Sequence, residues 1–299
     1  MAHPEAHLFL AGFGGYALAR KALAPIEAMR RETQKISAED LGARLSIQDP
    51  SDELGRLGAV LNDMLSRLQG AFEQLRRFTA DASHELRTPL TAIRSVGEVA
   101  LQDSKNAAEY RDVIGSMLED VDRLTRLVES LLSLSRADAN HIRLDRVGIS
   151  LFAVAEEAVA MLEVLAEEKH QTIDVQGERD VAVFADHLIL RQAIVNLLDN
   201  AIKYSPAESS ILFRVHRGES NTAILDVIDQ GPGIPVEHQP YVFDRFYRVD
   251  KARTREWGGT GLGLSITRWA VEAHRGEITL TSEEGRGTIF HVWLPEAPR

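Results

Sequence analysis

The stretch Phe78-Thr-Ala-Asp-Ala-Ser-His84-Glu-Leu-Arg-Thr-Pro-Leu90 lies inside a long heptad pattern, and that pattern decides the fold of the first half of the chain. Positions from Leu61 to Ala100 follow one another alternately four and three residues apart. Nearly all of them are apolar, with small or polar lapses only near Thr79. Such spacing predicts one long helix of the coiled-coil kind.

A second helix is predicted after a polar break around Ser104 to Ala107. Apolar residues then recur three and four apart as far as about Arg136, at Ile114, Met117, Val121, Leu124, Val128 and Leu131. The two helices are expected to form a hairpin with an apolar stripe that one copy of the chain cannot cover. Pairing of two hairpins into a four-helix bundle would bury that stripe, so the sequence predicts a homodimer.

His84 is predicted to face solvent on this hairpin. If Thr79 is heptad position a and Ala82 is d, His84 falls at f and Glu85 at g. A carboxylate bonded to one ring nitrogen would leave the other nitrogen free as a nucleophile, and Glu85 is placed to do this. Pro89 predicts a bend nearby because proline removes a helix hydrogen bond. The alternative is an ordinary solvated histidine, one of ten in the chain.

From about Val147 the sequence pattern changes to one of mixed helices and strands, which predicts a compact α/β domain of about 150 residues. The predicted helices are Leu151 to Lys169, His187 to Tyr204 and Leu264 to His274. The predicted strands are Thr172 to Val175, Ser210 to Val215, Ala223 to Ile228, Glu277 to Thr281 and Thr288 to Leu294.

One face of the helix ending at Tyr204 carries groups suited to phosphate chemistry. Asn196, Asn200 and Lys203 are four and three residues apart and therefore share a face, opposite apolar neighbours. Amide oxygens suit Mg²⁺, which binds together with phosphates, and Lys203 offers them a positive charge. Taken alone, this face also fits a simple solvated surface.

Two glycine-rich turns add to the pattern. In Asp226-Val-Ile-Asp229-Gln-Gly231-Pro-Gly233, an Asp at a strand end can accept a hydrogen bond from the amino group of adenine, although an ordinary hairpin turn fits as well. The run Gly258-Gly-Thr-Gly-Leu-Gly-Leu264 leads into a helix and predicts an anion cradle of backbone N–H groups. Between them, a basic lid over a triphosphate is predicted from Arg245, Arg248, Lys251, Arg253 and Arg255.

Composition limits the possible ligands. The chain has 34 Lys and Arg against 45 Asp and Glu, a net charge of −11, which argues against a broad nucleic-acid surface. It has no cysteine, so thiolate chemistry is excluded. The apolar stretch Leu8 to Ala19, followed by Arg20 and Lys21, is too short to cross a bilayer alone. It is interpreted as the cytoplasmic end of a transmembrane helix, with a buried helix start as the alternative.

Together these motifs resemble a known family. In chain order they resemble the H, N, G1, F, G2 and G3 boxes of sensor histidine kinases. The F box corresponds to Phe243 to Phe246, and the G3 box to Gly285-Arg-Gly-Thr288. Pro25 and the run Asp52-Glu-Leu-Gly55 resemble a HAMP module. The resemblance implies a multidomain chain: a coiled-coil, four-helix dimer bundle followed by an α/β sandwich ATP-binding domain of the GHKL (Bergerat) fold.

The resemblance also implies a division of the chain. Residues 1–20 would be the end of a truncated transmembrane helix and residues 21–71 a HAMP-like linker. Residues 72–138 would form the dimerisation and histidine phosphotransfer hairpin, and residues 147–296 the catalytic ATP-binding domain.

By the same resemblance, His84 accepts the γ-phosphoryl group of ATP, Glu85 acts as base and Thr88 positions water for a phosphatase reaction. Asn200 is the implied Mg²⁺ ligand, and Asp229 is the residue implied to recognise adenine. The further implied ATP-binding residues are Asn196, Lys203, Tyr204, Gly231, Gly233, Arg248, Gly259, Thr260, Gly261, Leu262, Gly263 and Thr288, with Arg248 reaching the γ-phosphate.

The implied partners are ATP, Mg²⁺, a second copy of the chain and a cognate response regulator whose receiver Asp takes the phosphoryl group. The implied location is the inner membrane, with these residues on the cytoplasmic side. Thr88 leaves open that phosphatase activity dominates over kinase activity, and two further alternatives stay open at this point. One is an ATP-driven conformational machine of the GHKL kind, and the other is a kinase-dead scaffold. The sequence does not indicate the input signal, the identity of the regulator, or whether phosphorylation occurs in cis or in trans.

Overall fold

The structure is a computed structural model, and it divides the chain into two compact units, residues 1–80 and 81–299. It describes residues 52–102, 106–138, 144–219, 221–249 and 259–297, together with single residues and short runs between residues 13 and 50. Helix α2 (Glu53–Gln102) contributes to both units. Most of the apolar stretch Leu8 to Ala19 and the residues Lys21 and Pro25 lie outside the described residues.

In the first unit the extended residues 43–47 pack on the early turns of α2. The side chain of Asn62 pairs with both backbone groups of Leu45, at 2.9 Å for the N–H and 3.0 Å for the carbonyl. Leu45 is buried, and Ile47 packs against Gly58. Asp52 caps α2, because its carboxylate accepts the N–H of Gly55. None of the helices among the described residues is long and apolar enough to cross a membrane.

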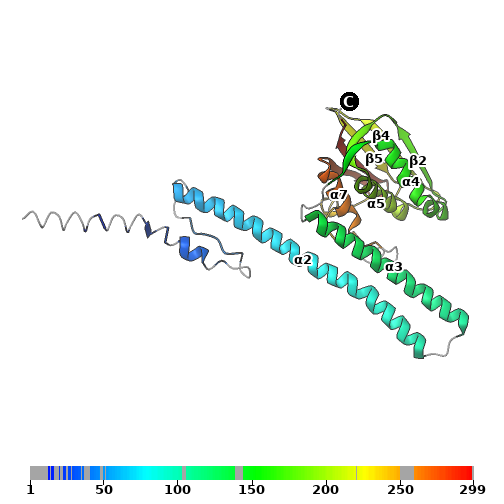
Figure 1. Cartoon of the computed structure of the whole chain (residues 1–299), viewed down its shortest axis with the longest axis horizontal. Helices are drawn as coiled ribbons and strands as arrows, with labels where there is room; N and C mark the ends of the chain where they lie inside the picture. Colours follow the sequence, from blue (N-terminus) through cyan, green and yellow to red (C-terminus); the bar gives the residue numbers. More distant parts are fainter. Residues whose placement is uncertain are drawn as a thin grey trace, which may run out of the picture. The chain divides into compact units, whose positions relative to one another are not determined.

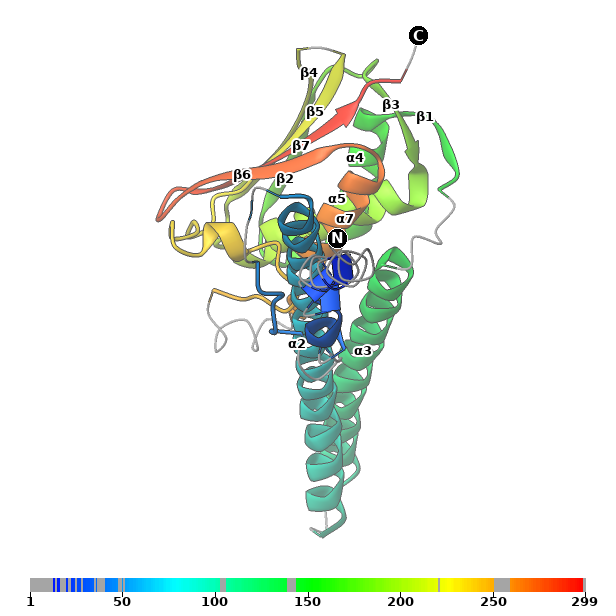
Figure 2. The same ribbon diagram turned by 90° about the vertical axis from the view of Figure 1, so that its left-hand side faces the viewer.

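In the second unit α2 and α3 (Ala107–Asp138) run side by side as the predicted hairpin (Figures 1 and 2). Asn106 starts α3 with a reciprocal cap: its side chain accepts the N–H groups of Ala108 and Glu109, and Glu109 accepts the N–H of Asn106. Helix α2 continues through Pro89 to Gln102, so the predicted single long helix is confirmed.

One copy of the hairpin leaves much of its apolar surface uncovered. Leu127 and Leu134, seven residues apart on α3, are buried. In contrast, Ile114, Val121 and Val128 are 55%, 44% and 37% exposed, although they belong to the predicted apolar repeat. Apolar side chains repeating every seven residues on an exposed helix face favour packing against another helix.

The rest of the second unit is an α/β sandwich (Figure 2). Five strands form a sheet in the order β2-β4-β5-β7-β6, and a separate pair joins β1 and β3. The strands are β1 (Arg146–Ser150), β2 (Thr172–Gly177), β3 (Ala182–Asp186), β4 (Ser210–Arg217), β5 (Thr222–Ile228), β6 (Glu277–Glu283) and β7 (Gly287–Pro295). The helices are α4 (Leu151–Glu168), α5 (His187–Tyr204), α7 (Gly263–Ala273) and the short η1 (Gln239–Tyr241).

The three longer helices cover one face of the five-stranded sheet, and the core lies between the two layers (Figure 2). Alternate residues of each strand point into it, as β4 shows with buried Ile211, Phe213 and Val215. The predicted three helices and five strands are all present. The strands β1 and β3 were not predicted. They pair with each other in antiparallel register, from Arg146 opposite Asp186 to Ser150 opposite Ala182.

Candidate active site

Helix α5 presents its polar residues on the face that the spacing predicts. Leu197, Leu198 and Ile202 are buried in the core, whereas Asn196, Asn200 and Lys203 are partly exposed on the other side. The side chain of Asn196 donates to the carbonyl of Gly263 at 3.3 Å, which joins α5 directly to the start of α7. Lys203 Nζ lies 3.5 Å from the carboxylate of Asp199, one turn earlier.

Asp229 follows β5 and is almost fully buried. One of its carboxylate oxygens, Oδ1, accepts the N–H groups of Gly231 at 2.8 Å and Thr288 at 3.1 Å. Burial raises the pKa of Asp229, and these two hydrogen bonds oppose the rise. Both bonds go to Oδ1, so the other oxygen has no hydrogen-bond partner among the described residues and can accept a hydrogen bond from the amino group of a purine ring.

The segment after β5 is held against the β6–β7 turn. Ser282 accepts the N–H of Ile234 and its hydroxyl donates to the carbonyl of Gly287. Gly287 has φ of 95°, and a Cβ there would lie 2.1 Å from the carbonyl oxygen of Asp229. The predicted residues Asp229, Gly231 and Thr288 are therefore brought together. Ser282 was not predicted, since a lone serine in a strand carries no signal.

The glycine-rich turn leads into α7 as predicted, and the start of α7 differs from the starts of α4 and α5. Helices α4 and α5 begin with side-chain caps from Ser150 and Asp186, but α7 has no side-chain cap at Leu262. The first N–H groups of an uncapped helix attract anions. Gly258 and the predicted lid residues Lys251, Arg253 and Arg255 lie outside the described residues.

Gly261 and Phe246 make a close backbone contact within this site. Phe246 donates its N–H to the carbonyl of Gly261 at 2.8 Å, and both residues have positive φ, 61° for Phe246 and 71° for Gly261. A Cβ on Gly261 would lie 2.9 Å from the backbone of Phe246. Only glycine fits there without displacing the segment Phe243–Phe246, called the F segment below.

We therefore expect Gly261→Ala to weaken ATP binding by about tenfold or more, because relieving the clash must move the turn or the F segment. Calorimetric titration with ATP measures this. Gly285→Ala is the matched control: Gly285 also has a positive φ of 80°, but nothing lies within 4 Å of its added Cβ. It should lower the melting temperature slightly and leave ATP affinity unchanged. Equal effects of both variants on affinity would contradict the assignment.

The hairpin displays His84 to solvent, as the heptad phase predicts. Its imidazole has no hydrogen-bond partner within the part of the chain that the structure describes. The hydroxyl of Thr88 donates to the backbone carbonyl of His84 at 3.1 Å, an ordinary bond within the helix. His84 is thus accessible from outside, and Thr88 lies one turn further along α2.

Glu85 is held by the nucleotide domain and not by His84. The guanidinium of Arg248 donates to Glu85 Oε2 at 2.9 Å; the Arg248 side chain is only 6% exposed and that of Glu85 31%. An ion pair this enclosed is costly to break on one side only. Sequence patterns gave no sign of this contact, because it joins residues 163 apart in the chain.

An apolar contact accompanies the ion pair. Leu127 and Leu134 of α3 pack with Leu262 and Ile266 at the start of α7, and the edge of the cluster is formed by Leu86, Leu131 and Phe246. The glycine-rich turn, the F segment and the His84 region are therefore in direct contact in this structure.

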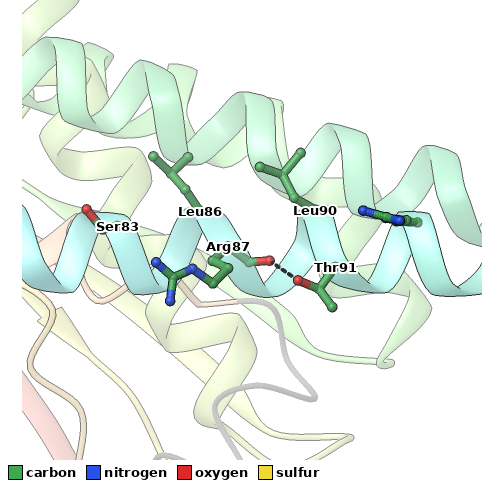
Figure 3. Close-up of a pocket in the computed structure, with 6 residues that line it drawn as sticks. Ser83, Leu86, Arg87, Leu90 and Thr91 are labelled. Carbon is green, nitrogen blue, oxygen red and sulfur yellow. Dashed lines mark hydrogen bonds between the residues drawn. The ribbon is translucent and has the colours of Figure 1, made fainter.

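A shallow groove lies on α2, and its lining begins at Ser83, the residue before His84 in the sequence (Figure 3). It is lined by Ser83, Leu86, Arg87, Leu90, Thr91 and Arg94. Figure 3 shows Leu86 and Leu90 on one side of the helix and the Arg87 guanidinium on another, while Thr91 bonds back to the carbonyl of Arg87. The groove combines apolar and basic surface next to His84.

A magnesium ion fits this site only together with a nucleotide. The described residues contain no group of three or more acidic or histidine side chains that could hold a metal. Asn200 offers one amide oxygen on the same helix face as Asn196 and Lys203. Mg²⁺ commonly keeps several waters and binds through one or two protein oxygens plus substrate phosphates, and Asn200 fits that arrangement.

Three family models match this chain in the order that the motifs predict. They are the HAMP domain at residues 17–70, the His Kinase A phospho-acceptor domain at residues 74–140, and the histidine kinase-, DNA gyrase B- and HSP90-like ATPase at residues 185–298. The chain is also 36% identical over 282 residues to the sensor protein CutS of Streptomyces coelicolor, covering 94% of this chain and 67% of CutS. The chain belongs to the sensor histidine kinases.

Other relatives agree with this assignment. This sensor histidine kinase is 37% identical over 278 residues to the sensor histidine kinase CusS of Escherichia coli O157:H7, which covers 92% of this chain and 57% of CusS. It therefore spans a little over half the length of that relative. The solved structure of the Acinetobacter baumannii histidine kinase AdeS matches with a TM-score of 0.60 at 25% identity, covering 72% of this chain and 98% of AdeS. The helical hairpin followed by an α/β ATPase domain is thus the fold of this family.

Proposed function

We propose that this sensor histidine kinase binds Mg-ATP in its α/β domain, transfers the γ-phosphoryl group to His84, and passes it on to an Asp of a response regulator. The observation that carries the proposal is the contact between Arg248, two residues after the F segment, and Glu85, the neighbour of an exposed His84. This contact brings the nucleotide domain to the acceptor segment. Positioning of this kind supplies most of the rate in phosphoryl transfer.

In the proposed step, a lone pair on one ring nitrogen of His84 attacks the γ-phosphorus in line with the leaving oxygen. A P–N bond forms, the bond from phosphorus to the bridging oxygen breaks, and ADP leaves. The imidazole then carries a proton in excess, which Glu85 accepts. Mg²⁺ held by Asn200 would neutralise charge on the phosphates, and Asp229 would accept the adenine amino group.

The proposal is tested by incubating the chain with γ-labelled ATP and Mg²⁺ and then exposing the labelled protein to acid or alkali. A phosphorylated histidine is lost in acid and survives in alkali, and the label should then move to a receiver domain. The rival function, an ATP-driven conformational machine, predicts ATP hydrolysis with no labelled protein. ATP turnover without any protein-bound label would therefore overturn the proposal.

Glu85→Gln should slow labelling of His84 by about 10²- to 10³-fold, because an amide cannot take the proton although it still accepts a bond from Arg248. ATP affinity should be unchanged or higher. A neutral amide holds Arg248 less tightly than a carboxylate does, so less free energy is lost when Arg248 leaves residue 85 to bind ATP. The measurement is the initial rate of labelling at saturating ATP. Glu98→Gln on the same helix, which breaks only an exposed pair with Arg94, is the control and should label normally. Normal labelling of Glu85→Gln would rule out Glu85 as the base.

Arg248 is assigned two successive contacts in this proposal. It holds Glu85 in the structure, and the family resemblance assigns it to the γ-phosphate. The γ-phosphate would compete with Glu85 for the guanidinium, so we expect the ion pair to weaken or open when the triphosphate binds. Thr88 would similarly have to turn from the carbonyl of His84 to hold a water molecule for phosphatase action.

The partners follow from surfaces of the hairpin. The groove beside His84, with Arg87 and Arg94 next to Leu86 and Leu90, suits the acidic phosphorylation site of a receiver domain. The exposed heptad residues of α3 suit a second copy of the chain. The chain would divide into a membrane-proximal segment, a HAMP-like linker at 21–71, the hairpin at 72–138 and the catalytic domain at 147–296, and would lie on the cytoplasmic side of the inner membrane.

A further inference from the structure

Three polar contacts join α7 to α5 along their antiparallel length. At the nucleotide end, Asn196 donates to the carbonyl of Gly263 at 3.3 Å. In the middle, the hydroxyl of the buried Thr267 lies 3.3 Å from the carbonyl of Ala193 and shares its single proton between that carbonyl and the carbonyl of Gly263 in its own helix, at 2.9 Å. At the far end, the ring of His274 accepts the backbone N–H of Asp186, the residue that caps α5, at 2.8 Å.

His274 differs from the other two in being titratable, and its surroundings fix its protonation state. It is 4% exposed, and Nδ1 lies 2.7 Å from the carbonyl oxygen of Ala270. A carbonyl can only accept, so Nδ1 carries the proton; the N–H of Asp186 can only donate, so Nε2 offers a lone pair. The imidazole is therefore neutral and held in one tautomer.

We propose that His274 is a positioning residue for the nucleotide site, which holds α7 in register on α5 and thereby holds the turn Gly259–Gly263 against Asn196 and Asn200. The proposal rests on the function proposed above, in that the nucleotide binds between that turn and α5. An 11-residue helix is about 16 Å long, so a bond at its far end limits its tilt.

The same bond makes the contact sensitive to acid. An imidazolium has an N–H on both nitrogens, which would set Nε2–H against the N–H of Asp186. Burial lowers the pKa of His274, and the bond to the Ala270 carbonyl opposes this lowering; the nearby Arg146 guanidinium from β1 lowers the pKa further, and the Asp186 carboxylate opposes it. The contact between His274 and Asp186 therefore persists somewhat below the ordinary histidine pKa of about 6.5, and the stability it gives is lost as pH falls through the lowered pKa of His274 in the folded chain.

Two substitutions separate the bonds of the imidazole. In His274→Gln, the amide oxygen reaches the place of Nε2 and can accept from Asp186, but the bond to Ala270 is lost. In His274→Asn, the amide nitrogen takes the place of Nδ1 and can donate to Ala270, but the N–H of Asp186 is left without an acceptor. Neither amide titrates.

The experiment is calorimetric titration of the full chain with ATP and Mg²⁺ at about pH 7.5 and about pH 5.8. His274→Gln should bind within about twofold of the natural protein at the higher pH and lose less affinity on acidification. His274→Asn should bind about tenfold more weakly already at the higher pH, because a buried N–H is unsatisfied. Comparison at each pH cancels the protonation of ATP itself.

The opposite ranking, with His274→Asn normal and His274→Gln weakened, would show that His274 only caps its own helix and would overturn the proposal. Equal affinity of all three proteins at both pH values would overturn it too. If the natural chain bound no ATP at all, the proposed function would fail first.

A further variant keeps the test open if either substitution unfolds the domain. Arg146→Gln removes a charge that helps to lower the pKa of His274 and also the bond from Arg146 to the carbonyl of Ala273 at the end of α7, so ATP affinity should begin to fall at a higher pH than in the natural protein. An unchanged pH profile would overturn the proposal.

Discussion

His84→Gln is expected to abolish the acid-labile label from γ-labelled ATP, a loss of at least about a thousandfold, because the attacking nitrogen is gone. ATP affinity should stay the same, since the His84 side chain is exposed on α2 and makes no hydrogen bond to the described residues of the nucleotide site. The measurement combines filter-bound label after alkaline quench with calorimetric ATP titration.

The control for this variant is His170→Gln, which changes an exposed histidine on the α/β domain. It should label like the natural protein. Label that survives in His84→Gln would remove His84 as the acceptor, whereas a parallel loss of ATP affinity would mean that the substitution disturbs the fold. The two readouts therefore distinguish chemistry from structure.

Asp229→Asn is expected to weaken ATP binding by about 10- to 100-fold, because a charge-assisted bond to the adenine amino group becomes a neutral one or is reversed. The fold should not suffer. The amide oxygen can still accept from Gly231 and Thr288, and the raised pKa of Asp229 means that its charge is costly in the folded domain above that pKa. The melting temperature without ATP should thus be unchanged or higher.

The matched control is Asp226→Asn, an equally buried carboxylate three residues earlier that bonds to His291 at 2.7 Å. This substitution should leave ATP affinity unchanged. If Asp229→Asn lowered the melting temperature without changing ATP affinity, Asp229 would be a structural residue and the adenine assignment would be wrong.

Much of the fold could be predicted because its signals are local. The boundaries of α5 match the prediction because Asp186 caps the helix and the apolar face follows the 3.6-residue period. The polar face of Asn196, Asn200 and Lys203 follows from the same spacing. The strands β1 and β3 were missed because each is five residues long and gains its place by pairing with a segment more than thirty residues away.

The same reason applies to the site. Glycine-rich turns and the string around His84 could be found by reading along the chain, since each motif is contiguous. The contacts of Glu85 with Arg248 and of Asp186 with His274 join residues 163 and 88 apart. Pairing across such distances leaves no periodic signal in a single sequence, and only the folded chain reveals which charged group meets which.

Because α7 begins without a side-chain cap, a bound nucleotide would stabilise the fold of the domain as well as serve as its substrate. Helices α4 and α5 satisfy their first N–H groups with their own side chains, and α7 leaves this task to water or an anion. Bound phosphates would supply those acceptors, so ligand occupancy should add to the free energy of unfolding, by about 2.7 kcal/mol at a hundredfold excess over the dissociation constant. Amide hydrogens in the first turn of α7 would then exchange more slowly with solvent, which makes cellular ATP a stabiliser of the domain even between signalling events.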